Sequence, residues 1–596
     1  MDDNESEPQE LPGPATSPVS PQAVRRFRRE LRRGEDVIDP ATFAGSLVQD
    51  RGIAPRVRVG RSRWFNLLWL LPIGFALLIS GVALAQGLRT IPAVQAFIQQ
   101  YPGPATMPSG APVGVPAWLS WQHFLNAFFL MFIVRSGAQI LTDHPRLYWT
   151  RHCTPGREWF RVQRPVPSDP LWTAKKDSTS LPHQVGLPGM RHSIGLARWW
   201  HFGVDTLWLA NGCVFYALLF ATGQWKRLVP ASWDVFPNAG SVAVQYLSLH
   251  WPVETGWSEY NALQLLAYFL TVFVAAPLAL LTGLGMSPAL STRLRRISSP
   301  LNIQTARSLH FLVLCWFLLF TVVHVTLVLT TGALRNLNHM YAGRNDDSWL
   351  GFGIFAVSLV VMVVGWVAAT PVTIRRPRLI QRLGYALIGP AQRLFEHVDA
   401  RPGQYDTSDV SPYLWHNGQY PESAEYADLF NENFAGYRLT VGGLVDHPVE
   451  LDLAQLRALP HHEQITQHFC IQGWSGIAHW GGISMTTLCE LVQPQARANW
   501  VVFYSFGEGP DEGIYYDAHP IEQMYYPLTM LAYDMNGAPL SYGHGAPLRL
   551  RNEAQLGFKM VKWIKGVEFV EDFSDIGGGY GGYNEDHELF GYRQPI

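Results

Sequence analysis

The sequence has few charged residues and few cysteines for its length. Only 15% of its 596 residues are charged, and the net charge of −2 gives no reason to expect a nucleic-acid partner. The five cysteines form no Cys-x-x-Cys pair and predict no disulfide framework. Long apolar stretches are abundant instead, and they gather between residues 64 and 373. The composition therefore predicts one apolar and one soluble half.

Six apolar stretches are long enough to cross a bilayer as helices, which takes about 20 residues each. They lie near residues 64–87, 118–141, 200–222, 261–285, 308–332 and 350–372. Eleven arginines precede the first span, and nine Arg or Lys residues lie in the loop 142–199. By the positive-inside rule, this charge pattern predicts that both termini face the cytoplasm and that the chain is integral to a bacterial cytoplasmic membrane.

Changes of composition divide the chain into five parts. A basic N-terminal segment, disordered at its Pro- and Ser-rich beginning, is followed by the apolar helices, a connector, a β-rich region and a Gly- and Tyr-rich tail. These parts are residues 1–63, 64–373, 374–425, 426–570 and 571–596. The predicted fold class is multidomain: an all-α transmembrane bundle followed by an α+β domain.

Four histidines lie within the apolar spans, where an ionisable residue is costly and is a functional candidate by default. They are His123, His201, His310 and His324. His310 and His324 are fourteen residues apart on the fifth span, so they share one helix face and are separated by about 21 Å. By topology His201 is level with His310, and His123 is level with His324.

This pattern predicts two bis-histidine haem sites stacked across the membrane. It resembles the dihaem cytochrome b subunit of formate dehydrogenases, which shows the same spacing on one helix. The alternative is that the histidines only pack at helix ends. Arg135, in the second span, faces either the bundle or a haem propionate, and the sequence does not choose between them.

Cys470 lies in the run His468-Phe469-Cys470-Ile471-Gln472-Gly473-Trp474-Ser475. Its thiolate would be a soft ligand suited to a redox metal. Further along, His544, Arg549 and Lys562 are donors of the kind that a phosphate-bearing cofactor needs.

Together these segments resemble the molybdopterin-binding domain of the sulfite oxidase superfamily, and most of all the catalytic subunit of methionine-sulfoxide reductases. The resemblance implies that Cys470 binds molybdenum and that several further residues contact the pterin cofactor. Those residues are Asn431 or Asn433, Ser505, His544, Arg549, Met560, Val561 and Lys562.

The substrate is less clear than the cofactor. Sulfite oxidases carry an arginine-rich segment just after the metal cysteine, whereas Gln472-Gly473-Trp474-Ser475 is neutral. This favours the reductase branch: quinol electrons would pass through two b-type haems to molybdenum, which reduces a small S-oxide or N-oxide. The reverse direction, a sulfite-type dehydrogenase that reduces quinone, uses the same residues. A non-catalytic haem electron-transfer or redox-sensing protein is the third possibility.

The remaining expectations concern the surroundings of the site. His468, Gln472, Trp474 and His479 flank the cysteine and are candidates for the substrate funnel. The histidines of the loop between the second and third spans are expected to be solvated: His144, His152, His183 and His192. Membrane lipid is an expected partner, and the sequence predicts neither the quinone site nor the oligomeric state.

Overall fold

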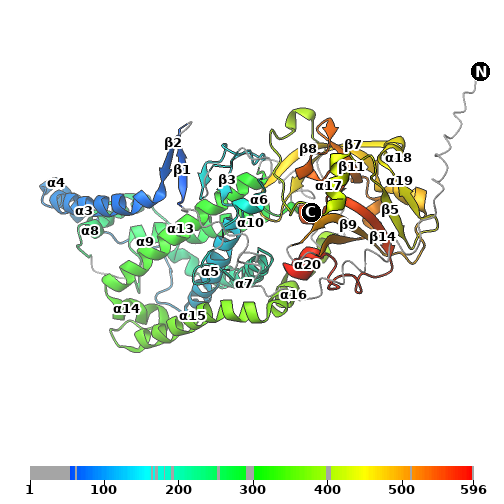
Figure 1. The fold of residues 1–596 in the computed structure, drawn as a ribbon. Helices are drawn as coiled ribbons and strands as arrows, with labels where there is room; N and C mark the ends of the chain where they lie inside the picture. Colours follow the sequence, from blue (N-terminus) through cyan, green and yellow to red (C-terminus); the bar gives the residue numbers. More distant parts are fainter. Residues whose placement is uncertain are drawn as a thin grey trace, which may run out of the picture.

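The computed structural model describes residues 54–60, 63–162, 165–167, 172–179, 181–189, 194–251, 256–289, 301–396, 405–509 and 513–592. The predicted disorder of residues 1–24 lies outside these ranges. A helical half and a β-rich half lie side by side, and the C-terminal tail with helix α20 (Tyr583–His587) lies between them (Figure 1).

The six predicted apolar helices are all present, and each is long and apolar enough to cross a membrane. They are α3 with its preceding turn (Leu67–Leu88), α5 (Ala117–Asp143), α7 (Ile194–Ala221), the α9–α10 segment (Ala262–Gly285), α13 (Ile303–Thr330) and α15 (Leu350–Arg375). Most of their apolar side chains are exposed on the protein, as expected for surfaces that contact lipid. These helices indicate an integral membrane protein.

Shorter elements complete this half. Helices α4 (Pro92–Gln100), α8 (Val235–Leu247) and α14 (Ala333–Leu337) connect the spans at one end of the bundle. At the other end, strands β1 (Arg56–Val59), β2 (Arg63–Asn66), β3 (Arg146–Leu147) and β4 (Phe160–Arg161) form a small sheet in the order β2-β1-β4-β3. The end of the predicted N-terminal segment is thus paired with the loop after α5.

The C-terminal half is an α+β domain with two five-stranded sheets, as predicted. The first sheet has the order β10 (Ile514–Pro520), β9 (Trp500–Glu508), β14 (Ile564–Val570), β5 (Leu439–Gly443) and β6 (Val449–Leu451). The second contains β12 (Ala538–Pro539), β11 (Thr529–Met535), β8 (Ser475–Ser484), β7 (His461–Phe469) and β13 (Arg549–Asn552), the last paired with β11.

Three helices accompany these sheets: α17 (Ala424–Asn431), α18 (Leu453–Ala458) and α19 (Met485–Val492). Ser484 begins α19 by accepting a hydrogen bond from the backbone of Thr487, and Cys489 of this helix is buried in the core. Apolar residues that alternate along the strands, such as Val501 and Phe503 of β9, are fully buried between the sheets and helices.

Helix α16 (Pro377–Glu396) links the two halves. It follows α15 after a single residue and crosses α7 where Gly384 approaches Trp199 closely, since a Cβ on Gly384 would lie 2.8 Å from the Trp199 ring. On its other side, Gln381 donates to the carbonyls of Leu589 (3.1 Å) and Phe590 (3.0 Å) in the C-terminal tail. The first part of the predicted connector is therefore a packed helix.

The β-rich domain docks directly on the ends of α7 and α13. Gln304 of α13 donates to the carbonyl of Gly473 (3.0 Å) and to Ser475 Oγ (3.1 Å), in the turn that contains Cys470. Trp199 of α7 donates to the carbonyl of Leu589 at 2.9 Å. Apolar side chains from both halves, Ile194, Ile303 and Ile471 among them, form one buried cluster.

Candidate functional site

Cys470 lies in a tight turn between β7 and β8. Its N–H donates to the carbonyl of Trp474 (3.0 Å), and the N–H of Gly473 donates to the carbonyl of Cys470 (3.0 Å). Gly473 has φ +99°, which only glycine adopts readily, and a side chain there would meet Arg307 of α13 at 3.2 Å. The turn is therefore fixed both by its own backbone and by the helical half.

The thiol of Cys470 is half-buried and sits among apolar side chains from both halves. Burial raises its pKa to about 12, so the free side chain is a neutral thiol at physiological pH. A bound metal cation removes this proton outright, which is how thiolate ligands form in such surroundings. The position suits a metal ligand better than a free nucleophile.

The structure brings three of the four predicted funnel residues together and places the fourth, His479, elsewhere. Gln472 and Trp474 are buried beside Cys470, and Trp474 Nε1 donates to Gln472 Oε1 at 3.1 Å. The His468 ring lies 5.1 Å from the Trp474 ring. His479 instead pairs with Glu463, at 3.2 Å, further along the β7–β8 hairpin.

His544, Arg549 and Lys562 are brought together at the start of β13 and β14. Lys562 Nζ donates to the carbonyls of Asn417 (2.5 Å) and Gly543 (2.9 Å), and Arg549 Nη1 donates to the carbonyl of His544 at 3.0 Å. Within the described residues neither cation has a carboxylate partner, and Arg549 Nε is buried without a hydrogen bond. Burial, with the nearby charge of Arg549, holds the pKa of Lys562 well below its usual range.

Buried cations without counter-charges are costly unless an anion completes the site. The donor set therefore fits the phosphate of a pterin cofactor. His468 lies beside the same cluster, and burial, followed by the nearby charges of Arg551, Arg549 and Lys562, lowers its pKa well below the ordinary value. Its Nδ1 lies 2.8 Å from Arg551, whose charge is balanced by Glu553 at 2.6 Å.

The other predicted cofactor contacts differ in burial and in their hydrogen bonds. Ser505 is fully buried, and its hydroxyl donates to the Lys562 carbonyl (2.6 Å) and accepts from the Gly507 N–H (2.8 Å), so it holds the Lys562 backbone. Met560 and Val561 are buried, and the Val561 carbonyl accepts from Leu550 N at 2.8 Å. Asn431 and Asn433 are exposed at the end of α17, where Asn433 adopts φ +50°.

Several residues of the connector, which motif reasoning missed, join this site. The carbonyl of Asn417 accepts from Lys562, and its side chain donates to Gln472 Oε1 at 3.0 Å. The His416 ring lies 5.3 Å from the His544 ring. The run Trp415-His416-Asn417, unusually polar and aromatic for a linker, was the available signal.

The loop after α5 also departs from expectation. His144 is fully buried, not solvated; it lies 5.1 Å from Trp415 and 6.0 Å from Tyr148 between ring centres. His152 Nδ1 is 2.7 Å from Ser411 Oγ. The prediction is wrong for His144 because the β-rich domain covers that part of the loop, and domain docking leaves no local pattern in a sequence. His152 is half-buried, His183 is exposed as predicted, and His192 lies outside the described residues.

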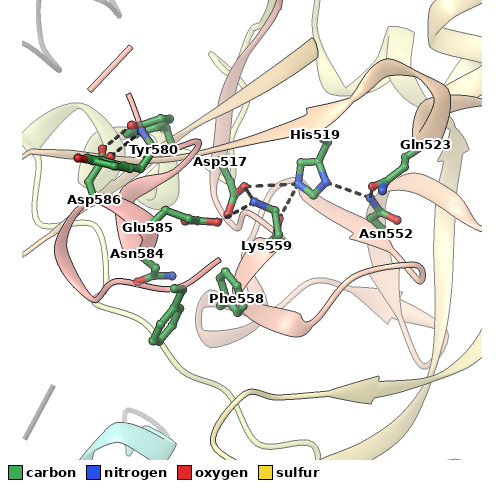
Figure 2. Close-up of polar contacts among 12 residues, drawn as sticks. Asp517, His519, Gln523, Asn552, Phe558, Lys559, Tyr580, Asn584, Glu585 and Asp586 are labelled. Carbon is green, nitrogen blue, oxygen red and sulfur yellow. Dashed lines mark hydrogen bonds and ion pairs between the residues drawn. The ribbon is translucent and has the colours of Figure 1, made fainter. Parts of the chain in front are cut away.

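A separate buried ion cluster fastens the C-terminal tail to the domain (Figure 2). Lys559 Nζ lies 2.5 Å from Asp517 Oδ1 and 2.8 Å from Glu585 Oε1, and all three side chains are inaccessible to solvent. Burial and the mutual repulsion of the two carboxyl groups raise the pKa of Asp517 well above its usual range. The cluster fixes Lys559, three residues before Lys562.

The four histidines in the spans form two neighbouring pairs, as the topology predicts, with the rings edge-on in His201–His310 (76° between planes) and tilted in His123–His324 (56°). The ring centres of His201 and His310 are 6.5 Å apart, and those of His123 and His324 are 6.2 Å apart. Two metal–imidazole bonds of about 2 Å to one iron would put ring centres about 6 Å apart. Both pairs therefore fit a bis-histidine iron site.

In one of these pairs, a hydroxyl group lies within hydrogen-bond distance of each imidazole. Ser136 Oγ lies 3.1 Å from His201 Nδ1, and Thr282 Oγ1 lies 2.9 Å from His310 Nδ1. Hydroxyls at Nδ1 orient each ring. Nε2 of His201 lies 3.5 Å from Asp205 Oδ2, so a metal at this nitrogen would have to displace that carboxylate. A Cβ on Gly137 would lie 3.0 Å from the His201 ring, so this glycine permits close approach.

The side chain of Arg135 faces the helical bundle, which is one of the two orientations that the sequence leaves open. Its guanidinium donates to the carbonyls of Gly186 (3.0 Å), Trp366 (2.5 Å) and His183 (2.6 Å) and to Thr370 Oγ1 (2.7 Å). These contacts tie α5 to α15 and to the following loop. Arg135 is a structural residue.

Comparison with known proteins agrees with this geometry. Residues 427–576 match the family model of the oxidoreductase molybdopterin binding domain. The β-rich half is thus an oxidoreductase domain of the molybdopterin-binding type, which contains Cys470, Arg549 and Lys562.

Individual relatives cover parts of the chain. The "Putative protein-methionine-sulfoxide reductase subunit YedZ1" of Azospira oryzae is 32% identical over 28% of this chain and 60% of its own length. The "Uncharacterized oxidoreductase YuiH" of Bacillus subtilis is 28% identical over 29% of this chain and 79% of its own. The "Protein-methionine-sulfoxide reductase catalytic subunit MsrP" of Campylobacter jejuni is 27% identical over 24% and 52%, respectively.

Proposed function

We propose that this chain is a membrane-bound molybdenum oxidoreductase in which two haem b sites connect the quinone pool to a molybdopterin site. Bound haem would supply one-electron transfer and molybdenum two-electron oxygen-atom transfer. In the proposed direction a quinol releases two electrons and two protons. A small S-oxide or N-oxide takes up two electrons and two protons and becomes the reduced compound and water.

The observation that carries the proposal is the placement of the His201–His310 pair. Ile194 and Ile303, which pack in one cluster with Cys470, each precede a histidine of this pair by seven residues. That spacing is about 10 Å along either helix. The second pair follows about 21 Å further along α13. The two histidine pairs are therefore spaced along α13, and the His201–His310 pair is the one nearer the Cys470 turn.

A small substrate suits the site better than a folded protein does. Gln472 and Trp474, next to Cys470, are buried under the loop after α5 and under Trp415. A methionine sulfoxide on a protein surface would have to displace these packed groups. A neutral S-oxide or N-oxide also fits the absence of arginines from residues 471–475.

The reverse direction remains the second candidate, since Arg307 lies against Gly473 and provides one cation near the turn. A sulfite-type substrate would then be oxidised and a quinone reduced. In either direction, the positive-inside rule places the molybdopterin domain in the cytoplasm. A C-terminal reporter that is active only outside the cytoplasm would overturn this sidedness.

The test compares two electron donors on the purified protein in lipid vesicles. We expect His201→Ala to abolish quinol-driven reduction of a small S-oxide while a reduced viologen dye, which reaches the molybdenum domain directly, still supports turnover. Cys470→Ser should abolish both activities. Equal quinol-driven rates in the wild type and His201→Ala would refute the proposed electron path.

A further inference from the structure

A pocket lies where the helical half, the Cys470 turn and the C-terminal tail meet. It encloses about 280 Å³ of space, its open mouth included. Its walls come from α7, α16, the cysteine turn and the tail: Gly195, Arg198, Trp199, Phe202, Gln392, Ile471, Phe590 and Gly591. Most of these are apolar, and Arg198 is the cation among them.

Arg198 differs from the other arginines in this region because no carboxylate or carbonyl of the described residues contacts its guanidinium, although the charge of an ionised Cys470 thiol would act on it. Within the described chain it forms no hydrogen bond or ion pair, and its guanidinium only lies over the Phe202 ring at 4.9 Å. Arg307, in the matching position three residues before His310, donates to the carbonyls of Arg146 (2.9 Å) and His144 (2.5 Å). Arg135 is likewise saturated by carbonyls.

A second unsatisfied group lines the same pocket. Gln392 Oε1 is buried and has no hydrogen-bond partner among the residues that the structure describes. Since the oxygen and nitrogen of a side-chain amide are interchangeable by rotation, Gln392 can present an N–H to a ligand. Arg198 and Gln392 together offer donors that converge from α7 and α16.

The charge of Arg198 decides the class of ligand. A neutral quinone or S-oxide would leave a partly buried cation uncompensated, whereas an oxyanion would neutralise it. Arg198 precedes His201 by three residues, which places it about 4.5 Å nearer the end of α7 and about 60° around the helix. It therefore borders both this pocket and the His201–His310 pair.

We propose that Arg198, assisted by Gln392, binds a carboxylate of the haem held by His201 and His310. This inference rests on the proposed function. Haem carries two propionates, which avoid the apolar membrane interior and require cations or water. Arg198 meets that need at the end of the bundle that contacts the Cys470 turn. An anionic substrate near molybdenum is the other source of an oxyanion.

The experiment is an optical redox titration of the purified full-length protein without substrate. Removing a positive charge beside a haem favours its oxidised form, so Arg198→Gln should lower the midpoint potential of the component that His201→Ala deletes. Arg198→Lys should retain most of the wild-type potential. Arg382→Gln removes an exposed cation from α16 and is the matched control.

The outcomes separate the two proposals. An unchanged potential in Arg198→Gln, or a shift equal to that of Arg382→Gln, would overturn the role of Arg198 while leaving the haem assignment standing. An unchanged potential with a raised KM for sulfite would show that the oxyanion is a substrate, which also overturns it. A protein without any haem component would instead refute the proposed function itself.

Discussion

Replacement of Lys559 by methionine tests the buried cluster that fastens the tail. In the wild type one ammonium lies 2.5 Å from Asp517 and 2.8 Å from Glu585, all inaccessible to solvent (Figure 2). Lys559→Met leaves two buried carboxyl groups facing each other. Removing one partner of a buried ion pair costs about 3–5 kcal/mol. The equilibrium constant for local opening of the tail should therefore rise roughly 10²–10⁴-fold.

The pH dependence has a defined sign. The pKa values of both carboxyl groups are raised in the folded state, mainly by burial. The folded state therefore keeps protons that the unfolded chain releases above about pH 4, and stability falls as the pH rises toward the folded pKa. In Lys559→Met, the loss of folding stability should be larger at pH 8 than at pH 5.

Hydrogen exchange of β10 and α20, read by mass spectrometry, measures this opening. We expect Lys559→Met to lose protection at pH 8 and to regain part of it at pH 5. Glu585→Gln keeps the Lys559–Asp517 pair and is the matched control, with protection close to that of the wild type. Unchanged protection in Lys559→Met at pH 8, or equal loss in both variants, would refute the reasoning.

Three further predictions concern the cofactors. Cys470→Ser should abolish turnover and molybdenum retention while the haem spectrum persists; a fully active serine variant would remove the thiolate assignment. Arg549→Ala should purify with less pterin, since a charge-assisted contact to a buried phosphate contributes about 1.5–3 kcal/mol; pterin analysis checks this. Ser136→Ala and Thr282→Val remove the partners of His201 and His310 Nδ1, and each should weaken haem retention about 10–100-fold, measured by haem loss to apomyoglobin.

The features that can be predicted from the sequence are those that depend on a local motif or on the period of a helix. The six spans follow from apolar length, and the facing of His201 with His310 follows from helix geometry and chain direction. The Cys470 turn, with Arg549 and Lys562, was recognisable as a motif. Each of these depends on residues close in sequence or on a fixed helical period.

The features that the sequence does not predict depend on contacts between segments that are far apart along the chain. His144 was expected in solvent, yet it is buried under Trp415, and Asn417 of the connector completes the lysine site. The hydrogen bond from the Ser505 hydroxyl to the Lys562 carbonyl, which holds the lysine backbone, is also not encoded in a local motif. The contacts of His144 with Trp415, of Asn417 with Lys562 and of Ser505 with Lys562 each join residues more than fifty positions apart and carry no spacing signal.

The most direct test of the account is a redox titration of the visible spectrum of the wild type and four histidine variants, with metal analysis of the same samples. We expect two haem b components per molybdenum. His201→Ala and His310→Ala should lose one component, and His123→Ala and His324→Ala the other. Loss of the same component from His201→Ala and His324→Ala, or a wild type that contains no haem, would contradict it.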